Sequence, residues 1–250
     1  SVSDNDGSVS DNDGSVSDND GSVSDNDGSV SDDYGCAIDN DCCCDDNDIH
    51  HHHDNNNCLD LRYWWSIVVG DAGPGGGIIF YDAGSIQSWG RYLEVACVSW
   101  QNNCVGTTAD PQAEWGCYGT PISGAAGTAI GTGEQNTTDI TAIVGGCPTS
   151  GIAARLANDL TLGGLSDWYL PSRNELNALC KWAFGDTVNT VCNNGGSGGL
   201  SLANGGFSTN FYWSSSEDTS NFAWSQQFGN GYQFNDIKLF PAYVRPVRSF

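Results

Sequence analysis

The chain has no methionine, few cationic side chains and no long apolar run. Its 250 residues include only 8 Lys and Arg against 31 Asp and Glu, and residues 1–61 contain no Lys, Arg or Glu. A surface this acidic repels phosphate, so binding to nucleic acid or to anionic lipid is disfavoured. No apolar stretch approaches the roughly 18 residues that cross a bilayer. The sequence therefore predicts neither a nucleic-acid partner nor a membrane span.

Cysteine usage indicates the compartment. Eleven cysteines in a chain poor in lysine are typical of a protein from an oxidising environment. The absence of methionine, also at position 1, leads us to expect a processed product whose signal segment has been removed. We therefore expect an extracellular or cell-surface protein.

Charge and aromatic residues are distributed unevenly along the chain. Residues 1–61 carry 17 Asp and a charge of −17, whereas residues 62–250 carry 14 acidic and 8 basic side chains, a charge of −6. Of the 27 aromatic residues only Tyr34 lies in the first segment. A segment with so little apolar area cannot fold alone. We expect an acidic repeat tail at 1–35, a Cys/Asp/His-rich linker at 36–61 and one globular domain at 62–250.

The tail repeats a seven-residue unit, SVSDNDG. The unit begins at Ser1, Ser8, Ser15 and Ser22, and a fifth copy decays from Ser29. One apolar residue per unit cannot form a coiled-coil seam, and the glycine disfavours a helix. An odd period also places successive valines on opposite faces of a strand. An extended or turn-punctuated chain remains, and the first four units could reach roughly 90 Å at about 3.3 Å per residue.

The Asp-Asn-Asp-Gly part of each unit offers the oxygen ligands that calcium prefers. The match to a calcium-binding loop is partial, because a Val stands where the first Asp belongs and no bidentate Glu follows. A solvated acidic spacer is an equal alternative. The candidate calcium ligands are Asp4, Asp6, Asp11, Asp13, Asp18, Asp20, Asp25 and Asp27.

A tail of this composition takes a fixed shape only when bound ions, attached glycan or a neighbouring subunit hold it. Repetition favours the neighbour, because one long tail offers several identical subunits a similar stretch. A head-to-tail contact is heterologous and generates a filament unless its rotation closes a ring. Main-chain pairing with an exposed sheet edge would supply affinity without large side chains. We therefore predict a homopolymeric fibre.

The linker concentrates cysteine and histidine. An odd cysteine total leaves at least one outside an intrachain disulfide, free to join neighbouring subunits. Thiols and imidazoles together could bind zinc, but the spacing matches no defined zinc module and exported thiols usually oxidise, so disulfides are favoured. The linker residues concerned are Cys36, Cys42, Cys43, Cys44, Cys58 and His50–His53.

Two helices are expected in the domain. The first covers Ile152–Leu160, where apolar residues recur at helical spacing before two glycines. The second follows Pro171, with Ser172 as N-cap, Glu175 completing a capping box and Gly185 as the stop.

The rest of the domain is expected to form short antiparallel strands and turns, which makes the fold class α+β. Residues 101–150 are polar and glycine-rich and are expected to form a long loop region. Expected strands are Ser66–Val69, Gly77–Tyr81, Tyr92–Cys97, Asp167–Leu170, Phe211–Ser214, Phe222–Phe228, Tyr232–Asn235 and Tyr243–Val247.

Four stretches carry a family resemblance: VGDAGPGGGIIFYDAG (69–84), DWYLPSRNELNAL (167–179), YWSSSE (212–217) and YVRPVRSF (243–250). They resemble the Lcl C-terminal domain family, named after a bacterial collagen-like adhesin. The resemblance spans about residues 66–250 and does not extend to the acidic tail. The C-terminal pattern is also similar to domains with a C-type-lectin-like or sulfatase-modifying fold, and we expect the C-type-lectin-like one. The resemblance implies a secreted or surface protein, and attachment or glycan binding rather than a fixed reaction.

Candidate glycan-binding residues lie near the third stretch. Trp213 and Trp224 could stack on a sugar face, although tryptophans in a domain this rich in them more often belong to the core. Glu217 is the neighbouring acidic candidate, and capping, a turn or calcium are its alternative roles.

No catalytic constellation is recognisable. Gly195–Gly199 satisfies GxSxG formally, but it lies in a glycine run without a preceding strand, and the histidines lie more than 140 residues upstream. We therefore expect a non-enzymatic protein. A fibre subunit is the first interpretation, and a surface adhesin that binds glycans is the alternative.

One disulfide is predicted by spacing. Cys180 lies on the second expected helix, and Cys192 follows 12 residues later, beyond the glycine stop. A returning loop can bridge this separation, and two separate buried thiols are the alternative.

Overall fold

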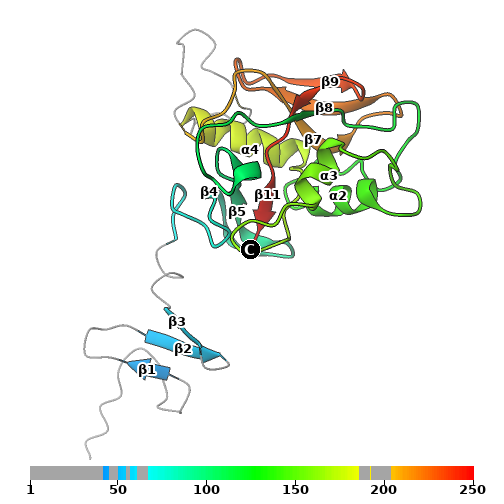
Figure 1. The fold of residues 1–250 in the computed structure, drawn as a ribbon. Coiled ribbons are helices and arrows are strands. Elements are labelled where there is room, and N and C mark those ends of the chain that lie inside the picture. Colours follow the sequence, from blue (N-terminus) through cyan, green and yellow to red (C-terminus); the bar gives the residue numbers. More distant parts are fainter. Residues whose placement is uncertain (1–41, 45–49, 55–56, 61–66, 186–191, 193–203) are drawn as a thin grey trace, which may run out of the picture. The chain divides into compact units, whose positions relative to one another are not determined.

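A computed structural model describes residues 42–44, 50–54, 57–60, 67–185, 192 and 204–250 (Figure 1). The chain divides into two units, Ser1–Arg62 and Tyr63–Phe250. In the first unit, β1 (Cys42–Cys44), β2 (His50–Asp54) and β3 (Asn57–Asp60) form an antiparallel sheet in the order β1-β2-β3. The predicted calcium ligands and the GxSxG stretch lie outside the described residues.

The described residues of the second unit form two sheets and three α-helices, which confirms the α+β class. The smaller sheet has the order β11-β5-β4 and the larger the order β6-β10-β7-β8-β9. Neighbouring strands are antiparallel, except that β10 pairs in parallel with β7. The strands are β4 (Ile78–Gln87), β5 (Gly90–Val95), β6 (Gln112–Ala113), β7 (Phe211–Glu217), β8 (Phe222–Gln227), β9 (Gln233–Ile237), β10 (Ala242–Tyr243) and β11 (Val247–Ser249).

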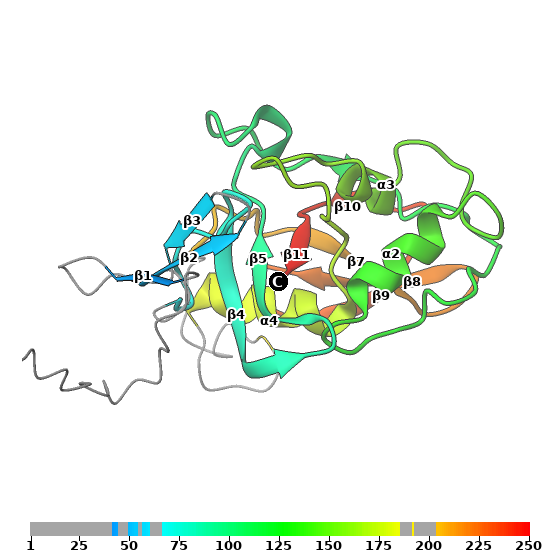
Figure 2. The same ribbon diagram turned by 90° about the horizontal axis from the view of Figure 1, so that it is seen from below.

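One helix contacts both sheets. α4 (Arg173–Phe184) packs against β4 of the smaller sheet and against β7 and β8 of the larger (Figure 2). α2 (Gly133–Thr141) packs against α3 (Ala153–Asn158) and β7. A 3-10 turn, η1, covers Trp100–Asn102. Among the described residues no helix is both long and apolar enough to cross a membrane.

Two apolar clusters form the core. One gathers buried tryptophans with α2 and α3, and the other gathers the apolar face of α4 with aromatic residues of β7 and its surroundings. The largest members of the first are Trp115, Trp168 and Trp213, and those of the second include Leu176, Leu179, Tyr212 and Phe228.

The start and end of α4 are those predicted. The Ser172 amide donates to Glu175 Oε2 at 2.7 Å, and the Glu175 amide donates to Ser172 Oγ at 3.3 Å, which completes the capping box. Gly185 ends the helix with φ 68°, a left-handed conformation that glycine adopts without strain.

Helix α2 was not expected, because it lies within residues 101–150, where a long loop region was predicted. Its sequence, GEQNTTDIT, has Glu134 and Gln135 as its only strong helix formers, and its other residues have weaker helix propensity and no clear apolar period. Tertiary contacts compensate for this weakness. Ile140 is buried in the core, and buried Asn136 bonds across to Gly127 and Ser215.

Two expected strands are wrong. Residues 67–70 form irregular chain and a turn rather than a strand. In the stretch Asp167–Leu170 only Tyr169 pairs, with Val247. The ladder does not continue because the next residue whose amide would point at the partner strand is Pro171, which has no amide to donate.

The segment expected as one strand over Tyr243–Val247 belongs to two sheets. β10 ends at Tyr243 and β11 begins at Val247. Between them Arg245 turns inward to Asp110, and Pro246 has no amide to donate. The C-terminal segment therefore crosses from the larger sheet to the smaller one.

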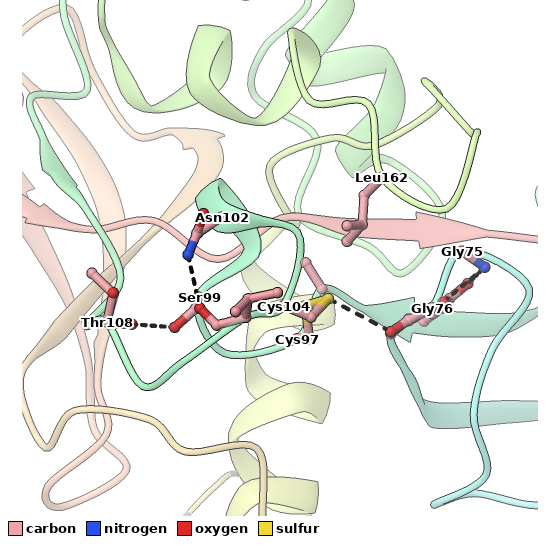
Figure 3. The surroundings of a disulfide bond; sticks show 12 residues. Gly75, Gly76, Cys97, Ser99, Asn102, Cys104, Thr108 and Leu162 are labelled. Atoms are coloured by element: carbon pink, nitrogen blue, oxygen red, sulfur yellow. Dashed lines mark hydrogen bonds between the residues drawn. A yellow bond between two sulfur atoms is a disulfide. The ribbon is translucent and has the colours of Figure 1, made fainter.

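Three disulfides close the domain. They are Cys97–Cys104 (Figure 3), Cys117–Cys147 and Cys180–Cys192, and the last is the pair predicted from spacing. Such crosslinking is typical of proteins from oxidising compartments.

Candidate functional site

A cleft of about 580 Å³ lies along the exposed side of α4. Residues from α4, from β4 and from the start of β9 line it. None of the described lining residues is acidic, although the chain carries 31 Asp and Glu. The polar and aromatic side chains in its lining include those of Arg173, Lys181, Asn174, Gln233, Tyr81 and Trp182.

The helix presents this polar side because its apolar residues occupy the opposite one. Leu176, Leu179 and Ala183 are fully buried, whereas Arg173 and Lys181 remain partly exposed. The two cations are eight residues apart, which places them about 12 Å apart along the helix axis at 1.5 Å per residue.

Arg173 is held without a carboxylate. Its Nε donates to Gln233 Oε1 at 2.9 Å, and its carbonyl accepts from Gln233 Nε2 at 3.0 Å. The guanidinium carbon lies 3.7 Å from the centre of the Trp224 ring. This stacking fixes the side chain while leaving its positive charge uncompensated.

The cleft holds two of the three cations of the described domain for which no carboxylate partner is found, the third being Arg155. Lys238, Arg91, Arg245 and Arg248 each form an ion pair with a carboxylate. Arg155 donates to two main-chain carbonyls, those of Thr149 and Cys147. In the described part of the chain, Arg173 and Lys181 are the cations with neither arrangement, and both line the cleft.

A buried carboxyl group lies at the start of α4. Burial raises the pKa of Glu175 to about 7, because the loss of hydration outweighs the backbone amides that favour the carboxylate. Its Oε1 accepts from the Gly131 amide at 2.7 Å. The helix that bears both cations therefore starts at a group that titrates near neutral pH.

The disulfide Cys180–Cys192 fixes the buried side of the same helix. The Cys192 amide donates to Asn177 Oδ1 at 2.8 Å, and Gln226 Nε2 donates to the same oxygen at 3.3 Å. These bonds tie α4 to β8.

The predicted glycan-binding residues do not form a shared surface site. Trp213 is fully buried, and its Nε1 donates to the Ala113 carbonyl at 3.0 Å, so the expectation that it stacks on a sugar is wrong. Trp213 pairs with Ser225 in the ladder, so Trp224 projects to the opposite face of the sheet. Trp224 is partly exposed, and its ring lies under Arg173.

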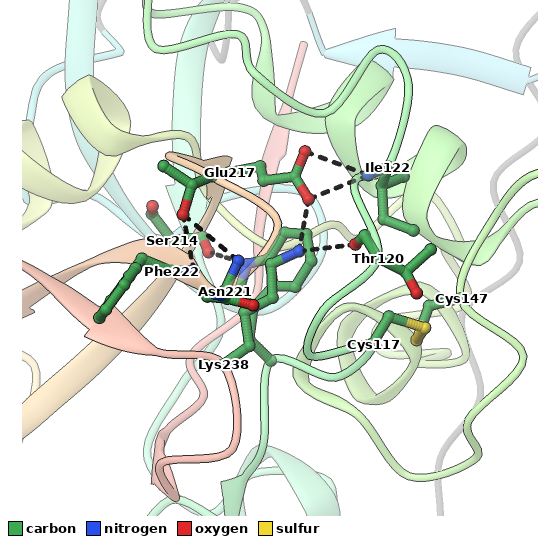
Figure 4. Close-up of polar contacts among 11 residues, drawn as sticks. Cys117, Thr120, Ile122, Cys147, Ser214, Glu217, Asn221, Phe222 and Lys238 are labelled. Atoms are coloured by element: carbon green, nitrogen blue, oxygen red, sulfur yellow. Dashed lines mark hydrogen bonds and ion pairs between the residues drawn. A yellow bond between two sulfur atoms is a disulfide. The ribbon is translucent and has the colours of Figure 1, made fainter.

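Glu217 is also withdrawn from the surface. Its carboxylate contacts Lys238 Nζ and accepts from the Ile122 amide at 2.9 and 3.1 Å (Figure 4). Lys238 is itself fully buried and donates to the Thr120 carbonyl at 3.1 Å. The group is structural, because both charges are compensated inside the protein.

The Lcl C-terminal domain model matches residues 95–248, more than half of the chain. The chain belongs to the Lcl C-terminal domain family. The match confirms the resemblance noted in the sequence, and the acidic tail lies outside it. No curated protein matches the chain.

Arg173 and Lys181 were missed by the sequence analysis of this Lcl C-terminal domain. Arg173 lies within the stretch 167–179 that carries the family resemblance, and Lys181 follows that stretch by two residues. Both belong to the helix whose apolar positions the sequence predicted. The scarcity of cations in the chain was the signal that could have identified them.

Proposed function

We propose that this protein is a non-enzymatic extracellular structural protein, the subunit of a fibre in which the acidic tail of one subunit docks on the domain of the next. The observation that carries the proposal is the opposite charge of two parts of one chain. Residues 1–61 hold 17 Asp and no cation, and the cleft along α4 holds two cations that no described carboxylate neutralises.

The reach of the tail favours contact between copies of the chain. If fully extended, the first four tail units could reach roughly 90 Å, whereas a domain of about 185 residues has a radius of gyration near 16 Å. A tail of that reach can leave its own domain and meet another. Because the contact joins two different surfaces, it is heterologous and propagates into a filament.

The test is assembly of the full chain, followed by electron microscopy and sedimentation. The double variant Arg173→Gln with Lys181→Gln should raise the critical concentration for assembly between about three- and thirtyfold, since each exposed ion pair contributes up to about 1 kcal/mol. Arg155→Gln removes a charge outside the cleft and serves as the matched control. Deletion of residues 1–35 should abolish assembly, and filaments that persist after it would refute the proposal.

Calcium is the proposed ligand of the tail aspartates Asp4 and Asp6 and of their repeats. Seventeen carboxylates without a cation repel one another within the screening length of about 8 Å at physiological salt, so an ordered tail needs counter-charge. Removal of calcium from the assembled protein by a chelator should disorder those parts of the tail that are not bound in a cleft. Unchanged order after chelation would leave subunit contacts or attached glycan as the source of order.

A surface adhesin that binds glycans is the alternative. Its support is the composition of the same cleft, where Tyr81 and Trp182 accompany the amide groups of Asn174 and Gln233. Aromatic rings and amides bind sugar faces and hydroxyls. Binding of oligosaccharides to the full chain, abolished by Trp182→Ala in the absence of any filament, would favour this alternative.

A further inference from the structure

The strand β9 ends the larger sheet with one side unpaired. It pairs with β8 along Gln233–Ile237, and no other described strand lies on its far side. Asn235 is exposed and Ile237 keeps 47% of its surface in solvent. An open edge of this kind offers main-chain donors and acceptors to an added strand.

One face of β9 changes in character along its length. Gln233, Asn235 and Ile237 alternate with the intervening residues and therefore share a face, the one on which Trp224 lies opposite Asn235. At one end Gln233 bonds to Arg173, and at the other end Ile237 pairs with Phe222. Between them Asn235 donates through Nδ2 to Asp218 Oδ2 at 3.2 Å. This face is thus cationic and polar at Gln233, has a carboxylate beside Asn235, and is apolar at Ile237.

The tail unit has the same pattern with the same spacing. In an extended SVSDNDG unit, Val2, Asp4 and Asp6 share one face because they are two residues apart. The remaining Ser and Asn side chains face the other way. In every later unit the Val and both Asp also share one face, although the odd period turns that face to alternate sides of an extended chain.

We propose that one SVSDNDG unit of a second copy adds to the edge of β9 as an antiparallel strand. Val2 then lies opposite Ile237, Asp4 opposite Asn235 and Asp6 opposite Gln233, next to Arg173. This inference rests on the proposed function and names the surface and the register of the contact.

The direction follows from the chemistry at the two ends. An antiparallel strand brings its Val to the apolar end and its last Asp to the cation, whereas a parallel strand reverses both contacts. Five residues, Val2–Asp6, match the five residues of β9, and Gly7 follows them, where a glycine lets the chain turn away.

Two permuted tails in the full chain test the register at unchanged composition and charge. In the first, Val2 and Asn5 and the matching pairs of the next three units are exchanged (SNSDVDG), which moves each Val off the Asp face of its unit and leaves it too far from the Asp of neighbouring units to share a five-residue strand face with them. In the second, Ser3 and Asn5 and their equivalents are exchanged (SVNDSDG), which keeps Val and both Asp in place. Assembly is followed by sedimentation, and β9 by hydrogen exchange of its amides.

The first permutation should raise the critical concentration about tenfold, the expected effect of exposing one Val side chain per contact. The second should assemble like the wild type, with the β9 amides protected in filaments and exchanging rapidly in the tail-deleted chain. Equal assembly of both permuted tails, loss of assembly in both, or filaments with unprotected β9 amides would overturn the register. Filaments formed without residues 1–35 would overturn the proposed function instead.

Discussion

The substitution Lys238→Met tests whether the buried ion pair beneath the Ile122 loop stabilises the domain. It leaves the Glu217 carboxylate buried, with the Ile122 amide as its remaining partner in this group. Removing one member of a buried pair costs about 3–5 kcal/mol, because the other charge stays desolvated without compensation. That is a large part of the 5–15 kcal/mol by which domains are typically stable.

For a domain of this size the loss corresponds to a fall in Tm of roughly 6–20 °C. Urea unfolding followed by tryptophan fluorescence measures it directly, since the chain has nine tryptophans. Arg91→Met, which breaks the more exposed pair with Asp82, is the control and should have a much smaller effect. Adding Glu217→Gln to Lys238→Met should restore part of the stability. A loss below about 1 kcal/mol in the single variant would refute the reasoning.

Three further outcomes are expected. Trp213→Ala should lower the free energy of unfolding by about 3–5 kcal/mol, measured by urea unfolding, because it empties a fully buried site; a neutral effect would contradict that burial. Replacing Cys180 and Cys192 by Ser should cost about 3 kcal/mol, and peptide mapping without reduction should recover the two cysteines linked rather than as free thiols. Because burial raises the pKa of Glu175 from its ordinary 4.5 to about 7, the folded state holds a proton between those values that the unfolded state has lost, so stability falls as pH rises through that window. Glu175→Gln should flatten this fall in denaturation midpoints taken from pH 5 to 7, and an unchanged slope would assign it to another group.

Local signals made α4 predictable. Its cap, its stop and its apolar spacing all lie within Ser172–Gly185, and each has a physical cause that acts over a few residues. Helix α2 has no such signals, because its helix depends on buried contacts of Asn136 and Ile140 with distant segments. Local sequence therefore predicts an element well only when the element is stabilised locally.

The candidate site could not be predicted from local sequence, because its contacts join residues that lie far apart in the chain. Arg173 meets Gln233 from 60 residues away, and no spacing rule relates the two. The aromatic strand YWSSSE did indicate a strand, but alternation alone does not say which face becomes the core. The sequence therefore left Trp213 open to both sugar stacking and core packing, and its ring lies in the core.

The internal ion pairs have a colloidal consequence. Lys238, Arg245 and Arg248 are enclosed with carboxylate partners, and their side chains expose 6% or less of their surface. The exterior of the domain segment is therefore left with at least two acidic groups for each basic one. Domains with such a surface repel one another at low ionic strength. At 0.1 M salt this repulsion is screened beyond a distance of about 10 Å. The acidic surface thus opposes non-specific aggregation of the domains. An anionic segment can approach them at the cleft along α4, which has no acidic residue in its described lining.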